Sequence, residues 1–527
     1  MEALSPAATP ASEKERPEDQ TTLTGQRKAY QGIFKATSLF GGVQVLNILM
    51  SVVRSKIIAV LLGPTGMGIA GLLHGTTLLV GGVTNFGLRT SAVKDVAAAN
   101  ASGDPEKVAT IAVVLRRWAW ISGLLGVGVM AGLSPWLSQL NFGNRDFTLA
   151  IVWVSITLLF TQISAGQMVI LQGLQKLRYL AQANVAAVGL VLLISIPVYY
   201  IWRNDGIVPV LILSSLLSLA VSWYFARKVP LQPVAVSWRT TVAEGKGMLR
   251  MGLMLSLGGL ISTATTYVLN VFISNRGGVD EVGLYKAGTA LITTYVGMIF
   301  AAMDTDYYPR LASVAYDNGQ TRTLINQQAE IAILILAPIL NVFLVAIQWI
   351  VLLLYSPDFV AVNGMIHWAV LGMYFKAVSW AIGYILLAKG ASKLYFWNEV
   401  IANLYILGFN AAGYAIGGLD GLGVSFLLAY ILYLAQVYSV AKYRYAFGFS
   451  REFYRVFGLQ LLLGLLCFGT VKVLPGPWRY GVGGLLILAS TLYAFYELDR
   501  RLDVKSLVRG LRRRASRGAD QYSGQKG

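Results

Sequence analysis

Four basic side chains lie within stretches of sequence that are otherwise apolar: Arg54, Arg89, Lys286 and Lys376. A charge surrounded by hydrocarbon costs about 3 kcal/mol or more on insertion, so such residues are seldom incidental. Guanidinium and ammonium groups bind phosphate and carboxylate oxygens, and arginine does so through two parallel hydrogen bonds. The pattern favours an anionic ligand held inside the protein. For Arg89 and Lys286, snorkelling to the membrane interface is the alternative interpretation.

Helical geometry indicates which polar side chains share a face with these cations. Asn47 lies on the same face as Arg54, whereas Lys56 points away from it. Such faces predict a hydrated cavity between helices, and packing through small and hydroxyl residues is the alternative. Four apolar stretches carry one: Thr37, Gln44, Asn47, Ser51 and Arg54; His74, Thr77, Gly81, Asn85 and Arg89; Ser256, Gly259, Thr263, Thr266 and Asn270; and Lys286, Thr289, Thr293, Gly297 and Asp304.

Three acidic residues lie within apolar stretches or close to their ends: Asp304, Asp306 and Glu399. A carboxylate in a partly dry cavity can take up and release protons as the cavity opens to one side or the other. With His74, these residues are therefore candidates for coupling transport to an ion gradient. The alternative interpretation is that these acids form ion pairs with a neighbouring arginine, either Arg310 or Arg89.

The composition sets the class of protein. Of 527 residues, 56% are hydrophobic and 13% are charged, whereas a soluble protein carries about a quarter charged residues. Apolar runs of about 20 residues recur, so we expect an all-α polytopic membrane protein. The single cysteine, Cys467, and the two histidines exclude an internal disulfide and predict neither a metal site nor a cofactor. No phosphate-binding G-x-x-x-x-G-K-[ST] loop is present, which excludes a nucleotide-driven pump.

We expect about 14 transmembrane helices joined by short loops. None of these loops is long enough to fold as a catalytic domain, so we do not expect an enzyme. The predicted spans are 35–62, 67–94, 117–140, 147–172, 179–202, 207–226, 248–275, 281–309, 328–355, 360–388, 395–417, 421–441, 453–474 and 478–498.

The distribution of lysine and arginine predicts that both termini are cytoplasmic. The chain has 43 of these residues, and most lie in the tails and in loops on the same side as the tails. Residues 1–30 are expected to be a disordered cytoplasmic tail, and residues 500–527 a basic tail held against anionic membrane lipids. The net charge of +18 therefore reflects orientation in the membrane and not a nucleic-acid partner. The outward loops hold few basic residues: Arg145, Arg203, Arg276, Lys472 and Arg479.

Two parts of the chain occur twice. The hairpin-like stretch RSKIIAVLLGPTGMG (Arg54–Gly68) has a counterpart in VLNVFISNRGGVDEVGLYKAG (Val268–Gly288), where an apolar helix, a glycine break and a second helix follow in the same order. Residues 174–206 likewise resemble residues 391–421, with a Lys-Leu pair before the helix and an Asp-Gly turn after it.

These repeats predict two related six-helix lobes with the same orientation, at residues 31–228 and 229–447. Residues 448–499 have no counterpart and are expected to form two additional transmembrane helices. Parallel repeats of this kind place a substrate site at the interface between the lobes, and the expected motion is rocking of one lobe against the other.

Two passages resemble a known family. KIIAVLLGPTGMGIAGL (Lys56–Leu72) is similar to the first hairpin of the Wzx-type flippases of O-antigen and enterobacterial common antigen. MDTDYYPRLASVA (Met303–Ala315) resembles the end of their eighth helix. These flippases form the polysaccharide transporter branch of the superfamily that also holds the MATE drug exporters and the lipid II flippase MurJ. The likeness covers residues 35 to about 447 in layout, but only the two passages are specific.

The resemblance implies a V-shaped pair of lobes, alternating access and a place in the bacterial inner membrane. It also implies flipping of an undecaprenyl-diphosphate-linked oligosaccharide to the outer leaflet, driven by an ion gradient, with a polysaccharide polymerase and a chain-length regulator as partners. By position, Arg54, Lys56 and Arg310 match basic places in the family passages, and Asp306 matches an acidic step. The smaller members have twelve spans, so the last two spans here are a departure.

We therefore predict a flippase for a polyprenyl-diphosphate-linked oligosaccharide. The alternatives are a MATE-like exporter of small molecules and a lipid II-type flippase, although an exporter of cations would need an acidic cavity. The predicted substrate-binding residues are Arg54, Arg89, Lys376, Lys286, Asn47, Asn270, Lys56 and Arg310, and the predicted ion-coupling residues are Asp306, Asp304, Glu399 and His74.

Overall fold

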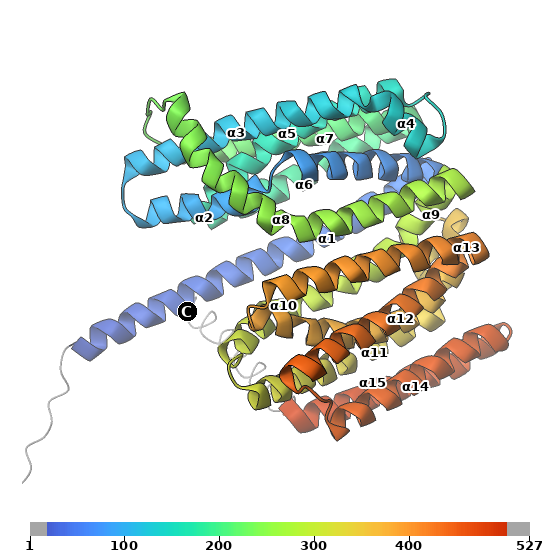
Figure 1. The fold of residues 1–527 in the computed structure, drawn as a ribbon. Helices are drawn as coiled ribbons and strands as arrows, with labels where there is room; N and C mark the ends of the chain where they lie inside the picture. Colours follow the sequence, from blue (N-terminus) through green and yellow to red (C-terminus); the bar gives the residue numbers. More distant parts are fainter. Residues whose placement is uncertain (1–17, 503–527) are drawn as a thin grey trace, which may run out of the picture.

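The chain folds into helices joined by short turns (Figure 1). The computed structural model describes residues 18–502, so most of the two predicted tails lies outside it. The helices, in order, are α1 (Glu18–Thr84), α2 (Leu88–Ala101), α3 (Pro105–Gly132), α4 (Ser134–Phe142), α5 (Thr148–Gly173), α6 (Leu177–Trp202), η1 (Arg203–Gly206), α7 (Ile207–Arg227), α8 (Trp238–Gly277), α9 (Val279–Thr289), η2 (Ala290–Tyr295), α10 (Gly297–Ser313), α11 (Asn318–Leu354), η3 (Pro357–Val362), α12 (Asn363–Ala388), α13 (Ser392–Tyr445), α14 (Arg451–Val473) and α15 (Pro477–Leu502).

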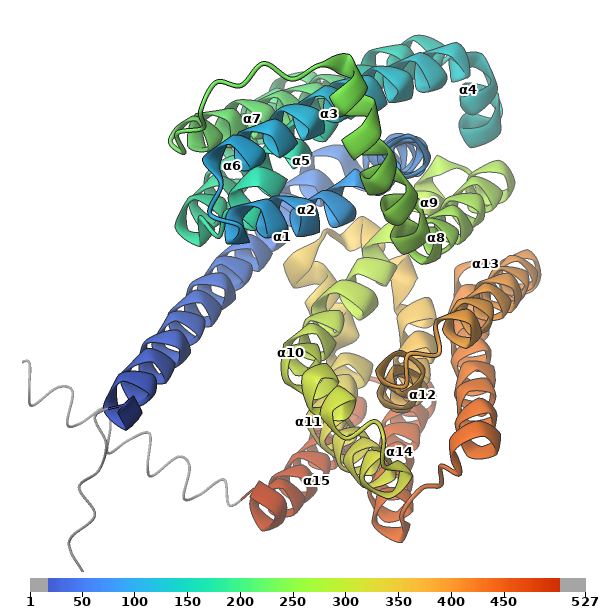
Figure 2. The ribbon, with the colours of Figure 1, turned by 60° about the vertical axis from the view of Figure 1, so that its left-hand side comes forward.

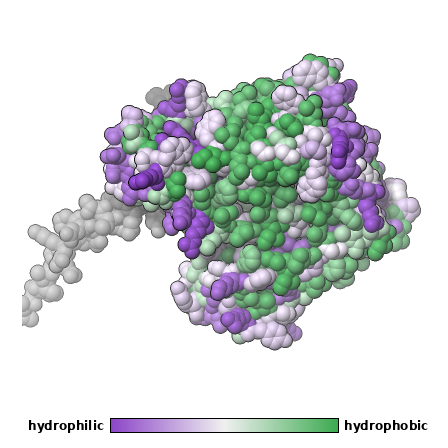
Figure 3. All heavy atoms as spheres, turned by 45° about the horizontal axis from the view of Figure 1, so that its top comes forward, coloured by the Kyte–Doolittle hydropathy of each residue, from purple (hydrophilic) through white to green (hydrophobic). Residues whose placement is uncertain are grey.

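Within the described residues, 11 helical segments are long and apolar enough to cross a membrane. Three of them, Leu46–Thr84, Leu177–Arg227 and Ser392–Tyr445, are each long enough for two crossings. They are interrupted at Gly63, at η1 and at Gly417–Gly418. Counting these three segments twice gives the fourteen spans expected from the sequence. Figure 3 shows a broad hydrophobic band with hydrophilic residues gathered toward opposite edges, as a polytopic membrane protein requires.

Short polar side chains start several of the helices. Asp104 accepts hydrogen bonds from two backbone N–H groups at the start of α3, where Pro105 follows it directly, and Ser237 caps α8 in the same way. At the start of α11, the backbone N–H groups of Gln320 and Gly319 donate to Asp317 and lower the pKa of its carboxyl group. These caps satisfy N–H groups that have no partner within the helix.

The helices form two groups, most clearly separated in Figure 2. One group contains α2 to α7 and the second part of α1, and the other contains α10 to α15. Helix α8 lies between them and is bonded to the first group at both ends. Near its start, Thr241 accepts hydrogen bonds from Arg117 and Trp118 of α3. Near its end, Ser274 donates to the backbone carbonyl of Asn141 in α4. The lobe boundary at 228/229 therefore stays a prediction.

The two predicted hairpins meet at one end of the bundle, called here the hairpin end. A Cβ atom added to Gly68 would lie 2.0 Å from the carbonyl oxygen of Val279, and one added to Gly283 would lie 1.9 Å from that of Pro64. The two turns thus pack backbone against backbone, which only glycine permits. Gly63 itself has φ +65°, a conformation that residues with a Cβ rarely adopt. The opposite end, where α7 ends and α8 begins, is called the basic end.

Lys56 joins the two groups at the hairpin end. Its ammonium group donates to the carbonyl oxygen of Leu352 at 2.9 Å and to that of Tyr355. These two carbonyl groups lie at the C-terminus of α11. The last carbonyl oxygens of a helix have no hydrogen-bond partner within it, and the helix dipole favours a cation there. The side chain therefore points away from the polar face of α1, as helical geometry predicted, and bonds to the backbone of the second group.

Helices α14 and α15 attach to α11 through buried ion pairs at the basic end. The Glu497 carboxylate, whose side chain is 2% exposed, lies 2.6 Å from Arg455 and 2.7 Å from Arg501. Arg501 also contacts Glu330 of α11 at 3.0 Å. The network links all three helices, so the additional pair is fixed to the second group.

Replacing Glu497 by glutamine is expected to loosen this attachment. The change weakens charge-assisted hydrogen bonds from Arg455 and Arg501 to a buried side chain and leaves Arg501 with Glu330 as its acidic partner, at a cost of about 2 kcal/mol. The purified protein should unfold at a midpoint several degrees lower in a thermal-shift measurement. Glu452→Gln, an exposed acid at the start of α14, is the matched control. An equal midpoint in the two variants would contradict the structural role of Glu497.

Candidate functional site

A group of basic and polar side chains gathers near the hairpin end and is called the cationic cluster: Arg54, Lys286, His74 and Tyr199. The Tyr199 side chain of α6 is buried and lies close enough to Arg54 to interact with its charge. His74 is close enough to Lys286 and Arg54 to interact with both charges, and the aliphatic part of Lys286 packs over Gly71. Arg54, Lys286 and His74 are predicted site residues that the structure brings together, and Tyr199 was not among the predictions.

The cationic cluster lacks an internal counter-charge. Among the ion pairs of the described residues, none involves Arg54 or Lys286. The Nε atom of Arg54 and the Oδ1 atoms of Asn47 and Asn270 are buried without a hydrogen-bond partner. Buried polar groups nearly always have partners, so unpaired ones favour a ligand or ordered water. The unpaired N–H of Arg54 suits an anion, whereas the two Oδ1 atoms are acceptors and suit a hydroxyl group or water.

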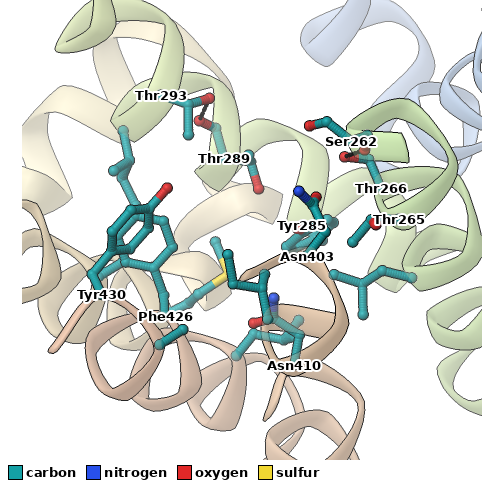
Figure 4. Close-up of a pocket in the computed structure, with 17 residues that line it drawn as sticks. Ser262, Thr265, Thr266, Tyr285, Thr289, Thr293, Asn403, Asn410, Phe426 and Tyr430 are labelled. Atoms are coloured by element: carbon teal, nitrogen blue, oxygen red, sulfur yellow. Dashed lines mark hydrogen bonds between the residues drawn. The ribbon is translucent and has the colours of Figure 1, made fainter. Parts of the chain in front are cut away.

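A second feature is a pocket of about 370 Å³ between α8, α9, η2, α12 and α13, called the hydroxyl pocket (Figure 4). Hydroxyl groups point into it from α8 on one side and from α9 and η2 on the other, and two aromatic rings of α13 face them. Its polar and aromatic lining consists of Ser262, Thr265, Thr266, Tyr285, Thr289, Thr293, Asn403, Asn410, Phe426 and Tyr430.

Lys376 and Glu399 lie beside the hydroxyl pocket. The Lys376 ammonium is 5.1 Å from the centre of the Tyr430 ring and 5.9 Å from that of Phe426, distances at which a cation is attracted to the ring face. Glu399 accepts a 2.8 Å hydrogen bond from the Tyr433 hydroxyl. Both residues were predicted site residues, but the structure places them with aromatic rings of the second group and not with Arg54.

Helix α9 connects the two features. Tyr285 lines the hydroxyl pocket, and the next residue, Lys286, belongs to the cationic cluster. Consecutive helical residues point about 100° apart, so a single helix presents one side chain to each. The pocket and the cluster are therefore neighbouring parts of one candidate site.

The sequence analysis missed the π-helix η2, which separates α9 from α10. Thr293 in this segment donates to the carbonyl of Thr289 and lines the pocket. Single π-turns widen a helix locally and occur often at functional sites. No periodicity in the sequence announces one, because the apolar pattern continues through it.

The remaining acids have partners in the structure. Asp304 accepts a 3.0 Å hydrogen bond from the Trp380 indole. Asp306 forms a 2.9 Å ion pair with Arg310, and their side chains are 70% and 53% exposed. Ion pairing, the alternative left open by the sequence, therefore describes Asp306. Its pair with Arg310 lies on the surface, outside both the cationic cluster and the hydroxyl pocket.

Arg89 is exposed at the start of α2, where Gly87 packs against Gly252 of α8. It is not part of the cationic cluster, and its predicted contact with substrate stays a prediction. Of the first polar face, Thr37 and Gln44 lie outside the side chains that the structure describes.

Comparisons with known proteins agree with this architecture. A family model described as polysaccharide biosynthesis protein matches residues 57–363. The lipid III flippases of Escherichia coli (strain K12) and Shigella flexneri are each 21% identical over 396 residues, which cover 72% of this chain and 91% of each flippase.

Solved structures share the fold. An inward-facing multidrug resistance MATE family transporter of the MOP superfamily has a TM-score of 0.63 at 14% identity, covering 82% of this chain and 96% of that one. The lipid II flippase MurJ in an inward closed conformation has a TM-score of 0.62 at 11% identity, covering 89% and 99%. An outward-facing MATE transporter has a TM-score of 0.53 at 15% identity, covering 78% and 96%.

The family match covers more than half of the chain and includes the first hairpin from Ile57 through the start of α12. This multi-pass membrane protein belongs to the polysaccharide biosynthesis protein family.

Proposed function

We propose that the protein is a flippase that moves an undecaprenyl-diphosphate-linked oligosaccharide, an O-antigen or related repeat unit, across the bacterial inner membrane by alternating access. The observation that carries this proposal is the juxtaposition of the cationic cluster with the hydroxyl pocket through α9. One is suited to a diphosphate, and the other to a sugar. The similarity to lipid III flippases supports the same substrate class.

In this proposal the diphosphate contacts Arg54 and Lys286. A guanidinium binds phosphate oxygens through two hydrogen bonds, and Lys286 adds a second charge from the facing helix. The Tyr199 hydroxyl lies beside the Arg54 guanidinium and is a further polar group for the phosphate. Because no acid pairs with either cation among the described residues, both charges are available to the ligand. A cationic drug would be repelled, which disfavours the exporter alternative.

The oligosaccharide occupies the hydroxyl pocket. Sugars present hydroxyl groups that donate and accept, and C–H faces that pack on aromatic rings. Thr266 and Thr293 donate to carbonyls of their own helices, which leaves their oxygen lone pairs for sugar hydroxyls. Phe426 and Tyr430 supply the ring faces. The Lys376 ammonium group lies within cation–π distance of both rings.

Alternating access requires the hairpin end to open. The close glycine contacts and the Lys56 bonds hold it shut in this structure. The lysine and arginine distribution supports a cytoplasmic basic end. Opening of the hairpin end then releases the head group to the outer leaflet.

The proposal is tested in proteoliposomes that contain the purified protein and an undecaprenyl-diphosphate-linked oligosaccharide labelled on its sugar. Exposure of the label to a membrane-impermeant reagent reports flipping. We expect flipping to require the protein and to discriminate against a lipid without a diphosphate. Transport of cationic dyes without flipping would instead support the exporter.

Coupling to protons is expected to depend on Glu399 and Asp304, the predicted coupling acids that accept hydrogen bonds from aromatic side chains of the second group. An imposed difference of about one pH unit supplies about 1.4 kcal/mol per proton, which is up to about tenfold in accumulation. In Glu399→Gln and Asp304→Asn we expect this stimulation to be lost, whereas Asp306→Asn, with its exposed ion pair, retains it. A wild-type rate indifferent to imposed proton and sodium gradients would exclude ion coupling.

A further inference from the structure

A separate cavity of about 630 Å³ lies among the helices of the first group. Its walls come only from α3, α5 and α7, with α5 packed against each of the other two. None of its lining residues belongs to the cationic cluster or the hydroxyl pocket. Because a single group of helices forms it, rocking of the two groups would not open it to the other side of the membrane.

The polar side chains that line this cavity are hydrogen-bond donors. Arg116 of α3 and Arg227 of α7 contribute two guanidinium groups. Gln167 of α5 is 7% exposed, and its carbonyl oxygen is already occupied by the hydroxyl of Ser222 at 2.7 Å. Its amide N–H groups are therefore the part left for a ligand. No carboxylate lines the cavity, and among the described residues neither arginine forms an ion pair.

The geometry of Arg227 favours a planar, fixed donor. Its guanidinium lies 3.9 Å from the centre of the Trp223 ring. This stacking restricts the side chain while leaving the N–H groups at its edge available, the arrangement that suits a phosphate group. Two positive charges, an amide donor and no acidic group together form a site for an oxyanion.

The rest of the cavity is apolar and lies within membrane-crossing helices. Leu159, Ile163 and Leu219 line it along α5 and α7. Trp120 and Trp223 are about half exposed at its edge, as tryptophans are at a membrane interface. Free phosphate would leave these walls uncovered, whereas a lipid would place its head at the arginines and an acyl chain along the leucines.

We propose that this cavity binds the phosphate headgroup of an anionic phospholipid such as phosphatidylglycerol, which stays in place during transport. Basic pockets between helices at the cytoplasmic side of membrane proteins bind lipid headgroups by this chemistry. Arg227 ends α7 at the basic end, beside Lys228, so the headgroup lies at the level of that surface. The binding does not depend on what the protein transports.

Native mass spectrometry of the full purified chain tests the proposal. We expect one phosphatidylglycerol to remain bound where phosphatidylcholine dissociates. In the double variant Arg116→Gln, Arg227→Gln, retention should fall by about tenfold or more, since charge-assisted hydrogen bonds to phosphate are lost. Lys228→Gln removes the neighbouring charge, which stacks on Tyr224 and does not line the cavity, and should bind like the wild type.

Equal retention of phosphatidylglycerol by the wild type and the double variant would overturn the proposal. So would equal retention of phosphatidylcholine, or displacement of the lipid by millimolar inorganic phosphate. If the double variant does not fold, Arg227→Lys keeps the charge and loses the stacked fork, and its retention should lie between those of the wild type and Arg116→Gln. A phospholipid that binds while oligosaccharide flipping fails would leave this site standing and remove only the proposed transport.

Discussion

Replacement of Arg54 by alanine should reduce oligosaccharide flipping by about 100-fold or more. Removing one partner of a buried charge pair, here the arginine that contacts the diphosphate, costs about 3 kcal/mol, which corresponds to that factor. The loss arises because the diphosphate would enter the cationic cluster with only Lys286 left of its two proposed basic partners, Arg54 and Lys286. Surface polysaccharide in a strain that depends on the variant should disappear.

The comparison that makes this result specific is Arg145→Ala. Arg145 is exposed in the turn between α4 and α5 at the hairpin end, so its replacement removes a positive charge from that surface without touching the cluster. Membrane abundance and thermal midpoint of Arg54→Ala should match those of this control.

The activity of Lys376→Ala should also fall, and the effect should be larger on the sugar-bearing substrate than on undecaprenyl diphosphate. Normal polysaccharide from both Arg54→Ala and Lys376→Ala would refute the assignment of the site.

A single methyl group at Gly283 should hold the hairpin end open. The Cβ of Gly283→Ala would lie 1.9 Å from the carbonyl oxygen of Pro64, a distance that the backbone must relieve by moving the turns apart. Overpacking costs about 1–3 kcal/mol, and this cost falls on the closed state alone. The closed population and the rate of flipping should both drop by about tenfold.

Spin labels at Thr65 and Asp280, exposed residues on the two hairpins, measure this opening. The native cysteine, Cys467, is fully buried, so it should not take up label. Gly283→Ala should lengthen the distance between the labels. Gly128→Ala, where an added Cβ meets nothing within 4 Å, should leave it unchanged. Identical distance distributions in the two variants would show that the glycine contact does not set the conformation.

The sequence predicted the helices well because their cause is local. Long apolar stretches must span the membrane as helices, and glycine or proline marks where they bend, as at Gly63. The direction of Lys56 followed from helical geometry alone. The polar faces of the seventh and eighth spans also proved informative, since Thr266, Thr289 and Thr293 line the hydroxyl pocket.

What the sequence could not supply depends on contacts between distant segments. Nothing in α3 or α8 alone indicates that Thr241 would bond to Arg117 and Trp118. Lys376 was expected beside the other cations, but the rings that its ammonium group faces, Phe426 and Tyr430, belong to α13. Which helix packs beside Lys376 is not written in the sequence around it. For Asp306, the sequence left two interpretations open, ion coupling and an ion pair with Arg310, and the structure shows the ion pair.

The bonds made by Lys56 have a consequence for evolution. Its partners are main-chain carbonyl oxygens, which every amino acid carries. A substitution at position 352 or 355 can therefore remove these hydrogen bonds only by changing the shape of the backbone. For the same reason, a substitution at either position does not require a matching substitution at Lys56. Methods that infer contacts from correlated substitutions would be blind to this junction, although it joins the two halves of the molecule.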